Sequence, residues 1–176
     1  MNIRIATSPD VDAIQAVHIN AFPEAEGAPV AKLAGDLLEE RTTPEILSLV
    51  AESGGEIVGH VAFSPVAITG NDELKGYILA PLAVKAASQN GGIGRALVED
   101  GLRRLSDMGV NVVFVYGDPD YYRRFDFSAD AALRYNAPYP LKYPFGWQAV
   151  VLTEPKPARS PVTISCVESL SDPGLW

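Results

Sequence analysis

Residues 78–102 read "ILAPLAVKAASQNGGIGRALVEDGL", and this stretch decides the fold. An apolar segment typical of a buried strand is followed by a loop with three glycines and then by apolar side chains at helical spacing. Glycines between a strand and a helix often let backbone N–H groups approach a phosphate. The stretch therefore predicts a strand, a loop and a helix, which ends near Gly109 because glycine suits a helix C-terminus. On its own, the loop fits either phosphate binding or close packing without a ligand.

Two common nucleotide-binding loops fit this stretch poorly. A Walker-type loop needs Lys and Ser or Thr after its last glycine, whereas Arg95 and Ala96 follow Gly94. A Rossmann loop needs a third glycine where this chain has Leu97, although Asp118 lies roughly where a ribose-binding acid is expected. An oxidoreductase that binds a nucleotide through this loop is therefore only a third hypothesis for the function.

The composition indicates one globular domain with a substantial core, because 47% of the 176 residues are hydrophobic and 20% are charged. A net charge of −8 argues against nucleic acid as a partner, since phosphate binding requires basic surfaces. The single cysteine, Cys166, excludes an internal disulfide framework and suits a reducing compartment. With no signal-peptide pattern and no apolar run long enough to span a bilayer, we expect a cytoplasmic protein that does not bind membranes.

Two helices are expected after a short N-terminal strand. Ser8 suits the N-cap and Pro9 the first position of a helix whose apolar side chains recur up to Ala21. The stretch PEAEGAP, residues 23–29, is predicted to be a flexible connection, and the second helix is expected to follow Pro29.

The rest of the chain reads mainly as strands, at 46–52, 57–68, 74–84, 110–116, 132–136 and 147–153. A short helix is expected after the N-cap Asp118. Residues 1–152 are therefore predicted to form a single α/β domain. Residues 153–176 are predicted to be a C-terminal extension with a proline-rich surface segment over 154–161 and an added strand within 162–170.

Two blocks of the sequence resemble one known family. Gln89-x-x-Gly92-x-Gly94, placed between a strand and a helix, resembles motif A of the GNAT family of acetyl-CoA-dependent N-acetyltransferases. The stretch VFVYGDPDYYRRFDF, residues 113–127, resembles the family's Tyr-x-x-x-Gly-Phe element, and both blocks are similar to a bacterial subgroup often called YhbS-like. The resemblance implies an α/β (α+β) fold over residues 3–152, with a mixed, mostly antiparallel sheet that is splayed at the cofactor strand and flanked by helices. Pro81 is consistent with parted strands, because it lacks an N–H group.

The resemblance also implies acetyl-CoA as the co-substrate and assigns its binding residues. The strand backbone would pair with the pantetheine arm, and one of its N–H groups would polarise the acetyl carbonyl. The loop and the helix N-terminus would hold the pyrophosphate, with the charge of Arg95 in support. The residues so assigned are Leu82, Ala83, Val84, Gln89, Asn90, Gly91, Gly92, Ile93, Gly94, Arg95 and Ala96.

By the same resemblance, Tyr122 is the catalytic acid that protonates the leaving thiolate, a role that suits a phenol because its pKa is close to that of the thiol. A packing role for both Tyr121 and Tyr122 is the alternative. Asp126 replaces the glycine of the family's Gly-Phe pair. If that position requires a positive φ, aspartate tolerates it less well than glycine but better than most residues.

No general base is assigned. The family's usual carboxylate position falls on Ala80 and Pro81, which cannot accept a proton. Other candidates are Glu24, Glu26, His60 and Glu73, but a single histidine in an apolar strand is more often structural, and exposed glutamates are usually only solvated. The resemblance implies Phe22, Glu24, Phe63 and Ser64 as walls of an acceptor pocket, and Cys166 is expected to be buried and unreactive.

The function predicted from these observations is transfer of an acetyl group from acetyl-CoA to a primary amine by direct attack in a ternary complex. The acceptor amine, whether a small molecule or a protein, is not identified by the sequence. A non-catalytic acyl-CoA-binding or interaction module is the alternative, because the strand carboxylate is missing. No metal is expected in the site, and the C-terminal strands could mediate a homodimer.

Overall fold

The computed structural model describes residues 1–154 and 161–176, which form two compact units. The first unit comprises Met1–Phe63 and Ala80–Gly101, and the second comprises Ser64–Leu79 and Leu102–Trp176. The proline-rich segment predicted over 154–161 lies almost wholly outside the described residues. Within the described part of the chain, no helix is both long and apolar enough to cross a bilayer.

The first unit contains an antiparallel ladder of β1 (Asn2–Ile5), β2 (Leu47–Ser53) and β3 (Glu56–Ile68). β2 and the first-unit part of β3 consist of apolar residues with little interruption, and they are buried over most of their length. Such runs are typical of strands covered on both faces. The predicted strands over 46–52 and 57–68 are therefore confirmed.

Helix α1 (Val11–Ala21) follows a 3₁₀ turn at Ser8–Asp10. Thr7 is the N-cap of that turn and Asp10 is the N-cap of α1, so the predicted N-cap Ser8 lies inside the turn instead. The Asp10 carboxylate accepts hydrogen bonds from the backbone N–H and the hydroxyl of Thr7, at 2.8 and 3.0 Å, which closes a capping box. It also accepts a hydrogen bond of 2.7 Å from the Arg4 guanidinium. The start of the helix is thus fixed by its own turn and by β1.

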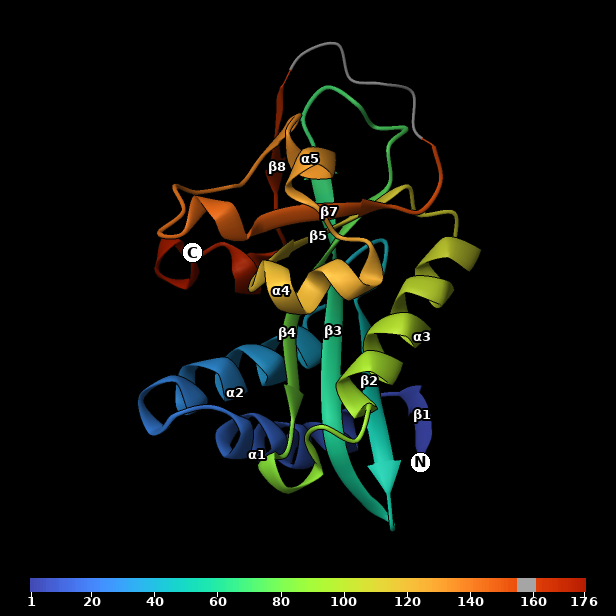
Figure 1. Cartoon of the computed structure of the whole chain (residues 1–176), viewed down its shortest axis with the longest axis vertical. Coiled ribbons are helices and arrows are strands. Elements are labelled where there is room, and N and C mark those ends of the chain that lie inside the picture. Colours follow the sequence, from blue (N-terminus) through green and yellow to red (C-terminus); the bar gives the residue numbers. More distant parts are fainter. Residues whose placement is uncertain (155–160) are drawn as a thin grey trace. The chain divides into compact units, whose positions relative to one another are not determined.

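The second helix, α2 (Glu24–Glu39), begins six residues earlier than the sequence predicted. The expected flexible connection over 23–29 is wrong, because Pro29 lies inside the helix. α2 lies beside α1 (Figure 1), and a Cβ on Gly27 would come within 3.3 Å of the Ile19 backbone. This close approach of two backbones gives the early turns of α2 a packing partner, which offsets the hydrogen bond lost at the proline.

Helix α3 (Ile93–Asp107) packs on β3 through positions without side chains. A Cβ built on Gly59 would lie 2.9 Å from Leu97, and one built on Gly101 would lie 2.2 Å from the ring of Phe63, which is fully buried. The helix ends before Gly109, whose φ is +78°, as the sequence predicted.

Replacing Gly101 with alanine should lower the free energy of unfolding by about 1–3 kcal/mol, because the new methyl group overpacks against Phe63. Helix propensity alone would raise stability by roughly 1 kcal/mol, so the sign of the change separates the two effects. Urea denaturation at equilibrium measures it. Gly91→Ala is the control, since the nearest atom to a Cβ there is 3.6 Å away. A Gly101→Ala variant more stable than the parent would contradict the packing described.

The second unit is built around β5 (Val112–Tyr116), which pairs in parallel with the first part of β4 (Gly76–Val84) and antiparallel with β7 (Trp147–Val151). β8 (Val162–Ser165), the strand predicted in the C-terminal extension, pairs antiparallel with the end of β3. It also pairs in parallel with β6 (Tyr135–Asn136). Of the strand predicted over 132–136, only these two residues form a strand.

Short helices connect these strands, namely α4 (Pro119–Tyr122), α5 (Ala129–Ala132) and 3₁₀ turns at Arg123–Phe125, Pro144–Gly146, Glu168–Leu170 and Pro173–Leu175. α5 replaces part of the strand expected over 132–136, because the Ser128 hydroxyl caps it by accepting a hydrogen bond from the Ala131 N–H at 3.2 Å. The predicted class, a mixed and mostly antiparallel sheet with flanking helices, is confirmed.

Candidate active site

All the residues assigned to the cofactor lie in the first unit, on one continuous stretch from the end of β4 to the start of α3. A 3₁₀ turn at Ala86–Ser88 follows the strand. The loop is held at both sides, since the Gln89 side chain donates a hydrogen bond to the Val84 carbonyl at 2.9 Å and the Ala86 N–H donates to Asn20 Oδ1 at 2.8 Å. Gln89 therefore orders the loop through its side chain.

The glycine loop reverses direction through two residues with positive φ, Asn90 at +62° and Gly92 at +82°. No atom lies within 4 Å of a Cβ built on Gly92, so backbone conformation is the reason for glycine there. The Ala96 N–H donates to the Gly92 carbonyl at 2.9 Å as the helix begins. The N–H groups of residues 93–95 belong to the first turn and have no intrahelical acceptor, which makes this end a donor site for anions.

Arg95 lies at the start of this helix, and its charge is already paired. Its guanidinium donates to the Glu99 carboxylate at 2.7 Å, one turn along α3, and this partner raises the pKa of the Arg95 side chain. Both side chains are well exposed, so the ion pair is weak and can open toward a phosphate.

The strand assigned to the pantetheine arm is the last part of β4. Ala83 is buried, and Leu82 and Val84 are half-buried. In the second unit, the parallel ladder between β4 and β5 covers only Gly76 to Leu79 and stops before Pro81. This end of the ladder agrees with the parting of strands expected from the proline.

Tyr122 lies in the second unit, at the end of α4. The helix begins as predicted, with the Asp118 carboxylate accepting a hydrogen bond of 2.9 Å from the Asp120 N–H and Pro119 in the first position. The Tyr122 ring packs on Gly117, where a Cβ would lie 2.6 Å from the ring. It also makes edge contacts with the rings of Tyr121 and Phe127, at centroid distances of 5.0 and 5.7 Å.

The two adjacent tyrosines have different surroundings. Burial, and then the Tyr121 and Asp118 groups, raise the pKa of Tyr122 well above its usual value, so its hydroxyl stays protonated at neutral pH. No hydrogen bond of that hydroxyl occurs within the described residues. Tyr121 is turned toward the Arg124 guanidinium, which lies 4.6 Å from its ring centroid. Tyr122 therefore has the properties of a proton donor, whereas Tyr121 packs at the surface.

Asp126 has a φ of +64° and a ψ of +15°, which is the left-handed conformation. The position that carries glycine in the family motif therefore requires a positive φ here as well, and aspartate adopts it.

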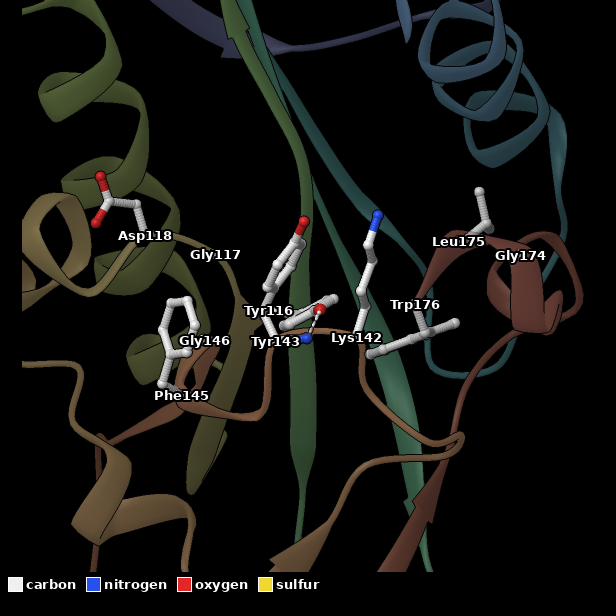
Figure 2. Close-up of a pocket in the computed structure, with 10 residues that line it drawn as sticks. All are labelled: Tyr116, Gly117, Asp118, Lys142, Tyr143, Phe145, Gly146, Gly174, Leu175 and Trp176. Carbon is white, nitrogen blue, oxygen red and sulfur yellow. Dashed lines mark hydrogen bonds between the residues drawn. The ribbon is translucent and has the colours of Figure 1, made fainter.

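A pocket of about 460 Å³ opens in the second unit beside the start of α4. Its walls include Tyr116, Asp118, Lys142, Tyr143, Phe145 and Trp176 (Figure 2). Four of these residues follow Phe127, where the strand and helix patterns of the sequence weaken, so the pattern did not reveal the pocket. The density of aromatic residues over 139–147 is the signal that could have shown it.

A chain of hydrogen bonds lies buried in the first unit, where the sequence suggested a single structural histidine. His18 Nε2 and His60 Nδ1 are 2.8 Å apart, and His60 Nε2 is 2.8 Å from the Ser48 hydroxyl. His18 Nδ1 is buried, and it has no hydrogen-bond partner among the residues that the structure describes. Burial lowers the pKa of His18 to about 4, and burial together with the neighbouring imidazole of His18 lowers the pKa of His60 well below its usual value. Both rings are therefore neutral at pH 7.

The other predicted candidates have simple surroundings. Phe63 and Ser64 are fully buried, Glu24, Glu26 and Glu73 are exposed, and Phe22 is half-buried and stacked on His18. Phe63 is therefore a core residue beneath α3 and not a pocket wall. Cys166 is half-buried, and burial raises the pKa of its thiol to about 12, which makes it unreactive as predicted.

Comparisons with known proteins agree with this fold. A family model described as an acetyltransferase (GNAT) domain matches residues 2–129. The N-acetyltransferase YjhQ of Escherichia coli K12 is 37% identical over 139 residues, which cover 78% of this chain and 75% of YjhQ. The N-acetyltransferase YhbS of the same strain is 39% identical over 132 residues, covering 74% of this chain and 75% of YhbS.

Two solved structures are similar along most of the chain. The structure of YhbS from Escherichia coli in complex with CoA has a TM-score of 0.81 at 31% identity and covers 97% of this chain and 92% of its own. A GNAT family acetyltransferase from Brucella melitensis in complex with acetyl-CoA has a TM-score of 0.65 at 32% identity, with 92% and 93% covered. The family model matches most of the chain, and both relatives are more than 30% identical to it over most of its length. The chain is therefore a member of the GNAT family of N-acetyltransferases.

Proposed function

We propose that this protein transfers an acetyl group from acetyl-CoA to a primary amine by direct attack in a ternary complex. The observation that carries the proposal is the glycine loop before α3, which offers unpaired N–H groups at a helix start. Relatives with the same fold have been crystallised with CoA and acetyl-CoA. The proposal extends that ligand to this chain.

The cofactor would lie along one continuous stretch of the first unit. The backbone of residues 82–84 would pair with the amides of the pantetheine arm in the manner of an added strand. The pyrophosphate would accept hydrogen bonds from N–H groups between Asn90 and Ala96, where Gly92 sets the turn. The exposed guanidinium of Arg95 would exchange Glu99 for a phosphate oxygen.

The reaction needs a neutral amine, a polarised carbonyl and a proton for the leaving group. The amine nitrogen attacks the thioester carbon, a C–N bond forms, and the C–S bond breaks. The nitrogen loses one proton to water, one proton passes from the Tyr122 hydroxyl to the thiolate of CoA, and the Tyr122 oxygen then takes a proton back from water. The Tyr122 phenol is protonated at neutral pH and its hydroxyl has no partner in the described part of the chain, while its raised pKa makes it a weaker acid toward the thiolate than an ordinary phenol.

Ligand-dependent thermal stability tests the cofactor. Acetyl-CoA at about 100 times its Kd should stabilise the protein by roughly 2.7 kcal/mol, which is a rise of several degrees in Tm for a chain of this size. NAD at the same concentration should leave Tm unchanged. A rise with NAD and none with acetyl-CoA would overturn the proposal in favour of a dinucleotide-dependent enzyme.

The alternative of a non-catalytic acyl-CoA-binding module rests on Ala80 and Pro81, which stand where many family members have a carboxylate. Such a module would show the same thermal shift with acetyl-CoA. It would release no CoA thiol when amines are added, whereas the enzyme would release thiol in proportion to the amine consumed.

Replacing Gly92 with valine should weaken acetyl-CoA binding by about tenfold or more, because a β-branched residue cannot hold a φ of +82° and the turn that aims the N–H groups would open. The fold should persist, since the space around this position is empty. Isothermal titration calorimetry measures the Kd. Gly55→Val is the matched control, because Gly55 also has a φ of +82° but lies in the turn between β2 and β3, outside the cofactor stretch. Equal affinity of Gly92→Val and parent would show that the loop does not hold the cofactor.

A further inference from the structure

The pocket beside α4 has aromatic walls that are already arranged for a planar group. The rings of Tyr116 and Trp176 are stacked with centroids 6.1 Å apart and an angle of 10° between their planes. Trp176 is fixed by a hydrogen bond of 3.1 Å from its indole N–H to the Leu170 carbonyl. Tyr143 and Phe145 add rings that are 51% and 68% exposed. Large exposed aromatic side chains around a cavity are typical of a ligand site.

The floor of the pocket is rigid. The Gly117 N–H donates to the Gly146 carbonyl at 3.0 Å, and the buried side chain of Gln148 donates to the carbonyls of both glycines at 3.2 and 3.3 Å. The Tyr143 N–H donates to the Tyr116 hydroxyl at 2.9 Å (Figure 2). A ligand would therefore meet walls that need little ordering on binding.

Two charged side chains stand at this pocket. Lys142 and Tyr143 point in the same direction in Figure 2, and the Lys142 ammonium lies 5.3 Å from the Tyr143 ring centroid. Within the described residues neither Lys142 nor Asp118 forms an ion pair, although one oxygen of Asp118 caps α4. An unpaired ammonium in a chain of net charge −8 favours an anionic group on the ligand.

The pocket shares its wall with the proposed catalytic acid. Gly117 lines the pocket, and the ring of Tyr122 packs against the same glycine. The Asp118 carboxylate, also at the pocket, is one of the groups that raise the pKa of Tyr122. The pocket and the ring of Tyr122 therefore have Gly117 as a common neighbour.

We infer that the acceptor of the acetyl group is an aromatic amino acid, whose ring lies against the walls formed by Tyr116, Tyr143 and Trp176. Its carboxylate pairs with Lys142, and its amine lies toward Gly117, the residue against which the Tyr122 ring packs. A polyamine fits less well, because its further ammonium groups would meet Lys142. This inference rests on the proposed function and on the same bond changes, with the α-amine as the attacking nitrogen.

Matched amines test the inference through thiol release from acetyl-CoA. L-Phenylalanine is compared with phenethylamine, which lacks the carboxylate, with L-alanine, which lacks the ring, and with spermidine. We expect kcat/KM for phenylalanine to exceed that for each of the others by about tenfold or more. In Lys142→Met the preference for phenylalanine over phenethylamine should fall toward one. Lys75→Met, an exposed lysine outside the pocket, is the control and should keep that preference.

The outcomes separate this inference from the proposed function. Acetylation of spermidine, alanine or phenethylamine at rates equal to or above phenylalanine would overturn the inference and leave the acetyltransferase in place. An unchanged preference for phenylalanine over phenethylamine in Lys142→Met would also overturn the inference and leave the acetyltransferase in place. If acetyl-CoA does not bind at all, the proposed function fails, and saturation-transfer NMR with phenylalanine and phenethylamine decides on the pocket. Stronger binding of phenylalanine that depends on Lys142 would support its recognition there, and equal binding would overturn it.

Discussion

Replacing Tyr122 with phenylalanine should lower kcat for acetyl transfer by about 10²-fold or more, which is the size of effect expected when a positioned general acid is lost. The ring and its contacts with Gly117 and Phe127 remain, so the fold and the Kd for acetyl-CoA should not change. Steady-state kinetics with saturating acetyl-CoA measures kcat. Because the pKa of Tyr122 is raised, the parent should keep its acid form and its activity up to at least about pH 10, the usual value of a phenol.

Tyr121→Phe is the matched control from the neighbouring position. It removes a hydroxyl from a ring that lies under Arg124, and kcat should stay within about twofold of the parent. Equal kcat values for Tyr122→Phe and the parent across the pH range would exclude Tyr122 as the acid. A loss shared equally by both variants would point to packing of the tyrosine pair instead.

Acid should destabilise the protein through the buried chain of His18, His60 and Ser48. Both histidines have a folded pKa below the usual 6.5 of an unfolded chain, so below pH 6.5 the unfolded state binds protons that the folded state does not. Stability is therefore full above pH 6.5 and is lost as the pH falls toward 4. Each histidine contributes about 1.4 kcal/mol per pH unit, so the free energy of unfolding should fall by about 3–5 kcal/mol between pH 6.5 and 4.5.

Urea denaturation at several pH values measures this loss. A variant with His18→Asn and His60→Gln keeps polar groups of similar size but nothing that titrates in the window, and it should show a much flatter dependence. Arg4 forms ion pairs with Asp10 and Glu52 in the same unit, and these pairs are unchanged in the variant. The difference between parent and variant therefore removes their contribution to the pH dependence of stability. An equal slope in parent and variant would contradict the neutral histidine pair.

Much of the fold could be predicted from local patterns of the sequence. The apolar runs, the glycine at the end of α3 and the Asp118–Pro119 start of α4 all formed as expected, since each depends on nearby residues. The start of α2 could not be predicted, because the contact of Gly27 with the Ile19 backbone joins two helices and outweighs the local signal of Pro29.

The candidate site was predictable in its loop and less so in its pocket. The glycine loop and Tyr122 belong to short motifs, so their positions follow from the sequence. Trp176 meets Tyr116 from 60 residues further along the chain, and His18 meets His60 across 42 residues, so neither pairing has a local pattern. The sequence predicted a positive φ at Asp126 only on the condition that this position has a conformation typical of glycine. The structure shows such a conformation, with a φ of +64°.

The most direct test of the account is to measure CoA thiol release and N-acetylated product together while each amine is added to the protein with acetyl-CoA. We predict that thiol release depends on the amine and that each mole of thiol is matched by one mole of acetylated amine. Binding of acetyl-CoA with thiol release that stays at the rate seen without amine, for every amine tried, would contradict the assignment of an acetyltransferase.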